Sequence, residues 1–237
     1  MIAPAFPTWT SADGRATIYH GDCLDVMRSM PDGSVDAVVT DPPYGTGAWK
    51  RAAAGSGGDC RAVMSREAWD EWDASWFIEA SRITKGPILI FCPQTRLPEV
   101  IALAGDSAWR IIIWGKPDPR PRFAGQMAYA FEPIVAIGSL QGHGGADLLI
   151  DSAPRLNRDA DATGHPHQKP IGVVRALVRV SCPKGGVVLD PHLGSGTTLV
   201  EALQEGCKAI GIEREAPYVE IAKARVAHEA AQGRLFA

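Results

Sequence analysis

Short runs of apolar residues alternate with amphipathic stretches along most of the chain. The apolar runs are rich in β-branched residues and are shorter than typical helices, so they predict strands. The predicted strands are 16–19, 36–40, 87–92, 110–114, 133–138, 187–190 and 209–213, and the predicted helices are 75–84, 95–104, 171–182, 197–205 and 217–229. This alternation favours an α/β fold with a mixed, mostly parallel sheet of seven strands and helices on both faces.

Two segments carry no hydrophobic period. Residues 45–59 are rich in Gly and Ala, which predicts a mobile loop directly after a strand. Residues 139–165 mix Gly, Asp, Arg, Asn and His, which predicts an irregular insertion. Neither segment is a convincing linker, and the sequence has no internal repeat. We therefore expect one domain over residues 1–237.

The composition permits one large core, because 46% of the 237 residues are apolar. A net charge of −3 and a pI near 6.1 give no general nucleic-acid signature, so a DNA-binding surface must come from local basic clusters. The five cysteines are odd in number and lack C-x-x-C spacing, which argues against a disulfide framework or a structural zinc site. With no leader-like amino terminus and no apolar run long enough to cross a bilayer, we expect a cytoplasmic protein without a metal.

The first motif with chemical potential ends a predicted buried strand: Asp41, Pro42, Pro43 and Tyr44. Two consecutive prolines fix two φ angles and remove two backbone donors, which leaves carbonyl groups that only accept hydrogen bonds. Acceptors beside an aromatic ring suit an amino group on a flat heterocycle, which needs partners for its N–H bonds and a ring to stack on. The alternative is an ordinary strand-to-loop turn with a surface tyrosine.

The second motif, residues 187–198, predicts a strand, a glycine-rich turn and the start of a helix. A P-loop would need Lys after the last glycine of the turn, where Thr197 stands. A dinucleotide fingerprint would need a third glycine, where Leu199 stands. Glu213, at the end of the next strand, is placed to bind a ribose hydroxyl. A nucleoside ligand therefore fits, and the alternative is a tight turn kept by sterics, with Glu213 as a solvated charge.

Taken together and in this order, the motifs resemble those of the DNA amino-methyltransferases, in particular their permuted β group, in which the catalytic motif precedes the cofactor motif. Further pieces resemble motifs of the same family, so the likeness spans roughly residues 16–226; they are Gly21-Asp22, Trp114-Gly115-Lys116, Phe131-Glu132 and His167-Gln168-Lys169-Pro170. The resemblance implies a Rossmann-like methyltransferase fold that uses S-adenosylmethionine. It also implies that Asp41, Pro42, Pro43 and Tyr44 are catalytic.

The cofactor site implied by the resemblance consists of Asp22, Lys169, Asp190, Pro191, His192, Gly194, Ser195, Gly196, Thr197, Thr198 and Glu213. His192 departs from the family pattern, which usually has phenylalanine there. A neutral imidazole can replace phenylalanine as an aromatic ring, whereas a charged one would make cofactor binding depend on pH.

The activity implied by the resemblance is transfer of a methyl group to the exocyclic N6 amino group of adenine in a flipped-out base of double-stranded DNA. The alternatives are the N4 amino group of cytosine, another acceptor such as RNA or a protein glutamine, and a silent nucleic-acid-binding relative. Further partners that the resemblance implies are a second copy of the chain and a companion restriction endonuclease. Candidate phosphate contacts are Lys116, Arg120, Arg122, Arg155 and Arg158, and the insertion at 139–165 is the candidate for target recognition.

Overall fold

The computed structural model describes residues 6–44, 73–117, 119, 127–140, 146–151 and 168–232. The loop predicted at 45–59 lies outside the described residues, as does most of the insertion predicted at 139–165. No helix within the described part of the chain is long and apolar enough to cross a membrane.

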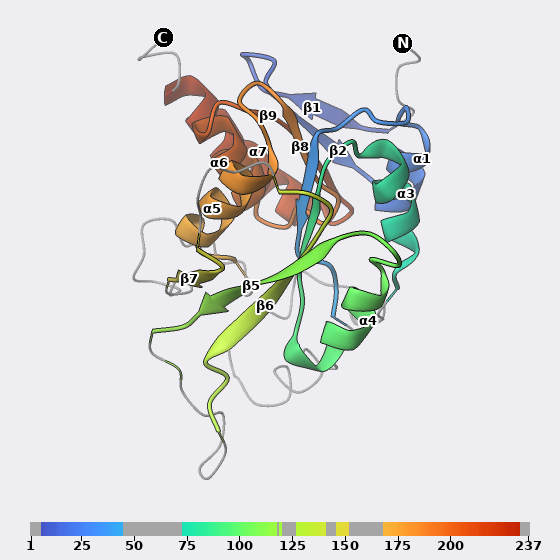
Figure 1. Ribbon diagram of the computed structural model, residues 1–237. Helices are drawn as coiled ribbons and strands as arrows, with labels where there is room; N and C mark the ends of the chain where they lie inside the picture. The colour runs from blue at the N-terminus through green and yellow to red at the C-terminus, as the bar shows by residue number, and fades with distance from the viewer. Residues whose placement is uncertain are drawn as a thin grey trace, which may run out of the picture.

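The described strands form one mixed sheet in the order β1-β2-β9-β8-β3-β4-β6-β5-β7 (Figure 1). Its strands are β1 (Thr8–Thr10), β2 (Ala16–His20), β3 (Ala37–Thr40), β4 (Ile88–Phe91), β5 (Trp109–Gly115), β6 (Phe131–Ile137), β7 (Leu148–Ile150), β8 (Val187–Asp190) and β9 (Lys208–Glu213). β1 and β6 run antiparallel to their neighbours, and the other neighbouring pairs are parallel. The predicted α/β class and mostly parallel sheet are confirmed.

The predicted number of seven strands is wrong, because the sheet has nine. The two additional strands, β1 and β7, lie at the edges and have three residues each. Three residues are too few to show an alternating pattern, and both strands have exposed first and last residues. β7 falls inside the segment predicted to be irregular, where its residues pair with β5 from Ile113 to Gly115.

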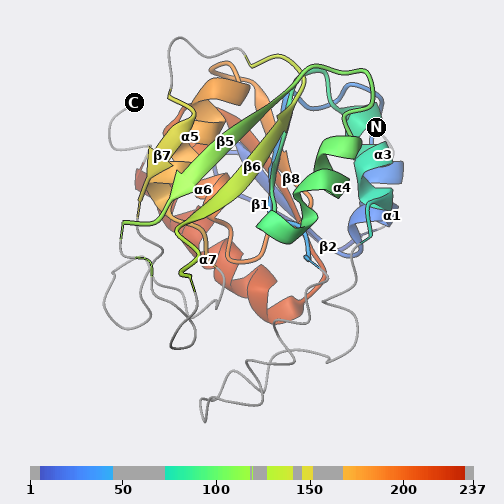
Figure 2. The ribbon, with the colours of Figure 1, turned by 60° about the horizontal axis from the view of Figure 1, so that its bottom comes forward.

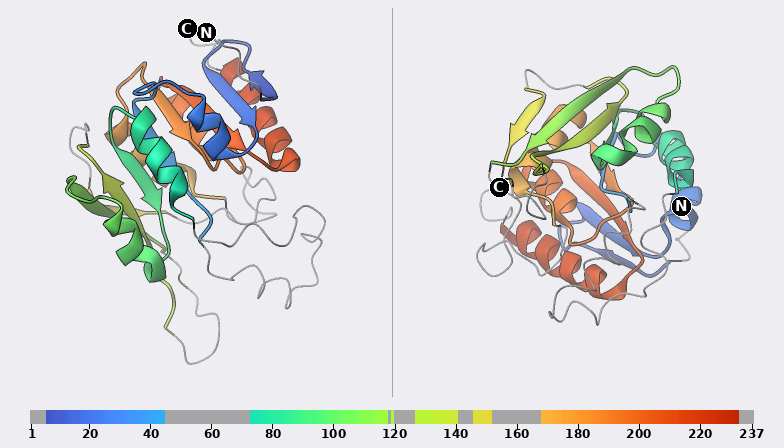
Figure 3. Two further views of the ribbon diagram at one scale, coloured as in Figure 1. Left: turned by 90° about the vertical axis from the view of Figure 1, so that its right-hand side faces the viewer. Right: turned by 90° about the horizontal axis from the view of Figure 1, so that it is seen from below.

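Helices cover both faces of the sheet, as predicted (Figures 2 and 3). On one face α5 (Ile171–Ser181), α6 (Thr197–Gln204) and α7 (Ala216–Gln232) pack on side chains such as Val39, Phe91 and Val188. On the other face α1 (Cys23–Arg28), α3 (Ser75–Ile83) and α4 (Leu97–Ala102) pack on Val38, Ile90 and Leu189. Adjacent residues of one strand thus enter opposite cores, which explains why the central strands are apolar at every position.

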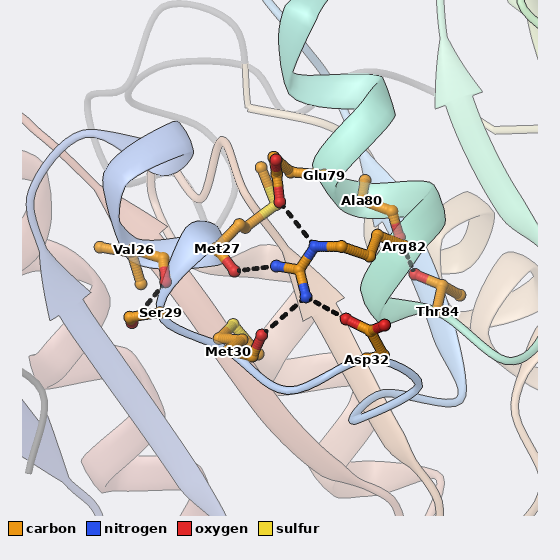
Figure 4. A network of polar contacts seen from close by, with 9 residues as sticks. All are labelled: Val26, Met27, Ser29, Met30, Asp32, Glu79, Ala80, Arg82 and Thr84. Carbon is orange, nitrogen blue, oxygen red and sulfur yellow. Dashed lines mark hydrogen bonds and ion pairs between the residues drawn. The ribbon is translucent and has the colours of Figure 1, made fainter. Parts of the chain in front are cut away.

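The helix α1 was not predicted, because six residues are too few to show a helical period. Arg82 of α3 holds it in place (Figure 4). The guanidinium group donates to the Met27 and Met30 carbonyl oxygens at 2.8 and 3.0 Å, so it satisfies acceptors at the end of α1. It also pairs with Asp32 and with Glu79, the latter at 2.8 Å. This contact fixes two helices that both contribute side chains to the candidate site.

The sheet brings the two sequence motifs together. β3, which precedes Asp41, and β8, which ends at Asp190, are parallel neighbours, with Val38 opposite Leu189. β9 lies on the other side of β8 and ends at Glu213. In open α/β sheets, ligands bind beyond the carboxyl ends of such strands. The fold therefore places both motifs at one edge of the sheet.

Candidate active site

The glycine turn after β8 has the backbone that its sequence predicts. Gly194 and Gly196 have φ values of +52° and +85°, a region that residues with a side chain rarely adopt. A Cβ atom on Gly196 would lie 3.0 Å from the Cβ of Ala222 in α7, so the turn also needs glycine for close packing. Gly196 is followed at once by α6, whose amino terminus faces the turn.

Asp190 is a structural carboxylate in this arrangement. It is 4% exposed, and its Oδ1 accepts from the Thr40 hydroxyl at 2.9 Å and from the backbone N–H of His192 at 3.1 Å. The Thr198 side chain is a further hydrogen-bond partner. Burial raises the pKa of Asp190 to about 6 despite these bonds. Asp190 therefore ties the end of β3 to the glycine turn.

Glu213 supports the turn from β9. Its Oε2 accepts from the Gly194 N–H at 2.8 Å, and its Oε1 accepts from the Glu215 N–H at 2.9 Å. Burial, only partly offset by these bonds, raises the pKa of this carboxyl above its usual value. The Arg214 N–H is a further donor to this carboxyl. A carboxylate has about four lone-pair positions, so one is left to accept from a ligand hydroxyl.

Three other residues of the predicted cofactor set have different surroundings. The Arg225 guanidinium donates to the hydroxyl groups of Ser195 and Thr197 at 3.2 and 3.0 Å, so these side chains bind α7. Asp22 is exposed and caps α1, where its Oδ1 accepts from the Leu24 N–H at 2.9 Å.

His192 is an uncharged ring in this site. Burial, followed by the charge of Arg214, lowers the pKa of His192 to about 3. Its ring lies edge-on to the ring of Trp76 in α3, with 5.1 Å between centroids. Nδ1 lies 3.1 Å from the Thr40 hydroxyl, and Nε2 lies 3.8 Å from the Cys23 thiol. The neutral imidazole considered in the sequence analysis is the form that these surroundings favour.

The catalytic motif is held by charged side chains from other elements. The Lys169 ammonium lies 2.6 Å from Asp41 Oδ2 and 3.7 Å from Glu132 Oε2. Lys116 lies 2.5 Å from Glu132 Oε1. The Tyr44 hydroxyl donates to Asp41 Oδ1. We call Asp41, Glu132, Lys116 and Lys169 the charged network. The negative charges of its two carboxylates are balanced by the positive charges of its two ammonium groups.

Protonation in this network follows from its geometry. Burial opposes the charge of Lys169, but Asp41 and Glu132 outweigh it and raise the pKa of the ammonium. Burial and the same two carboxylates raise the pKa of the Tyr44 hydroxyl well above its usual value. Tyr44 is therefore a hydrogen-bond donor to Asp41. Lys169, predicted in the cofactor set, lies against the catalytic motif, 5.4 Å from the centroid of the Tyr44 ring.

The backbone of the motif has its own support. Pro42 is buried and Pro43 half-buried, directly after the buried end of β3. The Arg96 side chain donates to the Tyr44 carbonyl oxygen at 3.3 Å, which holds the last residue of the motif against the start of α4. Pro191 is buried at the corresponding place after β8. Both strands thus leave the sheet through proline turns, which limit the conformations that follow.

Among the predicted phosphate contacts, only Lys116 lies within the described residues. Its ammonium pairs with Glu132 and lies 4.8 Å from the centroid of the Trp114 ring, so in this structure its charge is already neutralised. Arg120, Arg122, Arg155 and Arg158 lie outside the described residues. Their binding to DNA stays a prediction.

Sequence reasoning assigned no role to Thr40, Glu132 or Trp76, which the structure places at the site. Thr40 carried a signal, since it is a polar residue at the end of a buried strand next to the motif. Glu132 carried a signal as well, since Phe131-Glu132 resembles a family motif, but that resemblance gave it no role. Trp76 had no signal, because only the packing of α3 brings it to His192.

The chain is similar in sequence and fold to known DNA methyltransferases. The profile of a family described as DNA methylase matches residues 149–224. The type II methyltransferase M2.MboI of Moraxella bovis is 27% identical over 92% of this chain and 90% of its own length. The solved M1.HpyAVI–SAM complex shares 22% identity and a TM-score of 0.65, over 89% of this chain and 98% of that one. PvuII DNA methyltransferase (cytosine-N4-specific) shares 16% identity and a TM-score of 0.67, over 94% and 92%.

Proposed function

We propose that this chain is a DNA methylase that transfers the methyl group of S-adenosylmethionine to the N6 amino group of adenine in DNA. The observation that carries the proposal is the contact between Thr40 and Asp190. It holds the strand end that bears Asp41 beside the glycine turn that suits a nucleoside.

The residues at the glycine turn fit S-adenosylmethionine. Glu213 keeps an acceptor position for a ribose hydroxyl group beside its three backbone donors. His192 is partly exposed and backed by the buried Trp76, so it offers a neutral aromatic ring to an adenine. When bound, the cofactor supplies an electrophilic methyl group on a sulfonium. We propose that Lys169 acts on Asp41 and has no direct contact with the cofactor.

Asp41 and the Pro42 carbonyl would accept the two N–H bonds of the target amine. An exocyclic amine is a poor nucleophile, because its lone pair is conjugated with the ring. Acceptors at both N–H bonds favour a pyramidal nitrogen and stabilise the positive charge that develops on it. Lys169 and Tyr44 bind Asp41 at different oxygens, and each oxygen keeps a second lone pair. Fixed proximity of nitrogen and methyl group supplies much of the remaining acceleration.

The target base must leave the duplex to reach Asp41, with Tyr44 as its stacking partner. Lys169 lies near the Tyr44 ring, so stacking would use the part of the ring that Lys169 leaves uncovered. Asp at the first position of the motif accompanies adenine modification in the family that the sequence resembles, whereas Ser accompanies cytosine modification. Adenine is proposed on that basis.

The remaining parts of the proposal concern organisation. Residues 1–237 would form one methyltransferase domain, in which 139–165 recognises the target sequence. Double-stranded DNA is the proposed substrate, with a second copy of the chain and a restriction endonuclease as proposed partners. The proposed location is the cytoplasm, where a reducing environment suits the free thiols.

The test is to methylate unmethylated duplex DNA with the purified chain, digest it to nucleosides and identify the methylated base by mass spectrometry. We expect N6-methyladenine. N4-methylcytosine without methyladenine would overturn the base assignment and leave the enzyme class intact. Methyl transfer to RNA or protein, with none to DNA, would overturn the proposed substrate.

A further inference from the structure

Four side chains from different parts of the chain lie in a row across the site: Cys23, His192, Thr40 and Asp190. The Cys23 thiol is 3.8 Å from His192 Nε2, and His192 Nδ1 is 3.1 Å from the Thr40 hydroxyl. That hydroxyl is in turn 2.9 Å from Asp190 Oδ1. Thr40 and Asp190 are buried, with exposures of 1% and 4%. Water therefore cannot replace the contact between Thr40 and Asp190 without opening the site.

The direction of the hydrogen bonds follows from the number of protons. Asp190 accepts from the backbone N–H of His192 and, when ionised, has no proton to give. The single hydroxyl proton of Thr40 therefore goes to Asp190, and the Thr40 oxygen is left as an acceptor for His192. Nδ1 must then carry the imidazole proton, which makes Nε2 an acceptor that faces the Cys23 thiol.

We propose that His192 is a positioning residue that couples the methyl-donor site to the catalytic motif through its Nδ1–H bond to Thr40. Thr40 directly precedes Asp41, and His192 lies in the glycine turn. We call this bond the Thr40–His192 link. A phenylalanine could fill the same space beside Trp76, but it has no donor and would leave the two strand ends joined only through Asp190.

The effect on catalysis rests on the proposed function. The existence of the Thr40–His192 link does not. The imidazole tautomer can be read from nitrogen-15 spectra of the free protein. We expect His192 in the Nδ1–H form near pH 7.5. Finding the Nε2–H form would overturn the proposal whether or not the protein transfers methyl groups.

The catalytic half is tested with Thr40→Val, Thr40→Ser, His192→Phe and the double variant Thr40→Val/His192→Phe. We expect Thr40→Val and His192→Phe each to lower kcat by roughly 10- to 100-fold, the range expected for small misplacements of reacting groups. Cofactor Kd should stay within about threefold, because the aromatic surface remains in both. The double variant should fall no further than either single one, since both break the same bond. Thr40→Ser keeps the hydroxyl and should restore most of the loss.

Thr84→Val is the matched control, because it removes a half-buried hydroxyl that donates to the Ala80 carbonyl far from the site. It should lower thermal stability without changing kcat. Additive losses in the double variant, or wild-type kcat in Thr40→Val and His192→Phe, would overturn the coupling. If the wild-type chain transfers no methyl group, the proposed function fails. The tautomer and a double-variant cycle in thermal stability then decide whether the link exists.

Discussion

The two halves of the candidate site are built differently. Around the glycine turn, Glu213 and Asp190 accept mostly backbone N–H groups and hydroxyl groups, and the aromatic ring beside them is neutral. Around Asp41, the contacts join charged side chains: two ammonium groups and two carboxylates. The cofactor half is thus held by groups whose geometry the backbone fixes. The catalytic half depends on side chains that must meet from separate elements.

This difference predicts how each half responds to change. Backbone N–H bonds survive most side-chain substitutions, so the glycine turn should tolerate changes around it. The charged network has no such support, and removal of one member leaves buried charges without a partner, which is costly. Substitutions in the network should therefore damage methyl transfer, while substitution of Glu213 should mainly damage cofactor affinity. His192 is the exception in the cofactor half, because the Thr40–His192 link joins it to the catalytic motif.

The largest effect should come from Lys169→Met. Without the ammonium, Asp41 and Glu132 lose their shared partner, which leaves two carboxylates with less compensating charge. We expect kcat near neutral pH to fall by roughly 10²- to 10³-fold, as for loss of a preorganised charged group. Steady-state kinetics at saturating cofactor measure this.

Lys223→Met is the control for Lys169→Met, since Lys223 pairs with the exposed Glu220 on the surface of α7. It should leave kcat unchanged. An equal loss of cofactor affinity and kcat in Lys169→Met would place Lys169 in the cofactor half and break the proposed division.

A smaller effect is expected for Glu213→Gln. The amide keeps the shape but removes the charge and one acceptor, so both the ribose contact and the bond to Gly194 weaken. Loss of a charged hydrogen bond costs about 1.5–3 kcal/mol. Cofactor Kd, measured by calorimetry, should rise accordingly, while kcat at saturating cofactor should change much less. Unaltered affinity would show that Glu213 only supports the turn.

The smallest effect concerns Asp190 and stability. Its pKa of about 6 in the folded protein lies above the unfolded value of about 3.9, so the folded state holds the proton more tightly. The stability contributed by Asp190 therefore falls as the pH rises from the lower value to the higher. Between about pH 4.5 and 6.5, the free energy of unfolding of the wild type should drop by roughly 2 kcal/mol relative to Asp190→Asn. If the difference in free energy of unfolding between the wild type and Asp190→Asn stayed constant over this pH range, the raised pKa of Asp190 would be contradicted.

The sequence predicted the cofactor half better than the catalytic half, for the same physical reason. The turn with Gly194 and Gly196 lies within one short segment, and its residue types require its backbone. Lys169 meets Tyr44 from 125 residues away, and nothing local in the sequence indicates that contact. The position of Lys169 just before α5 was consistent with a contact in the cofactor half or in the catalytic half of the site.

The edges of the fold show a similar limit. The central strands were predictable because both faces are buried and every position is apolar. β7 has exposed residues at Leu148 and Ile150, and only its pairing with β5 makes it a strand. The contact between His192 and Thr40 could not be predicted from the sequence either, because it requires β3 and β8 to be neighbours in the sheet.

The most direct test of the division into two halves is Asp41→Ala, measured by calorimetry with S-adenosylmethionine and by transfer of a radiolabelled methyl group to unmethylated duplex DNA. Asp41 touches Lys169 and Tyr44 but none of the residues of the glycine turn in the described contacts. The account predicts cofactor affinity within about threefold of the wild type and a loss of transfer of at least roughly 10²-fold. Full transfer by Asp41→Ala, or loss of cofactor binding together with transfer, would contradict it.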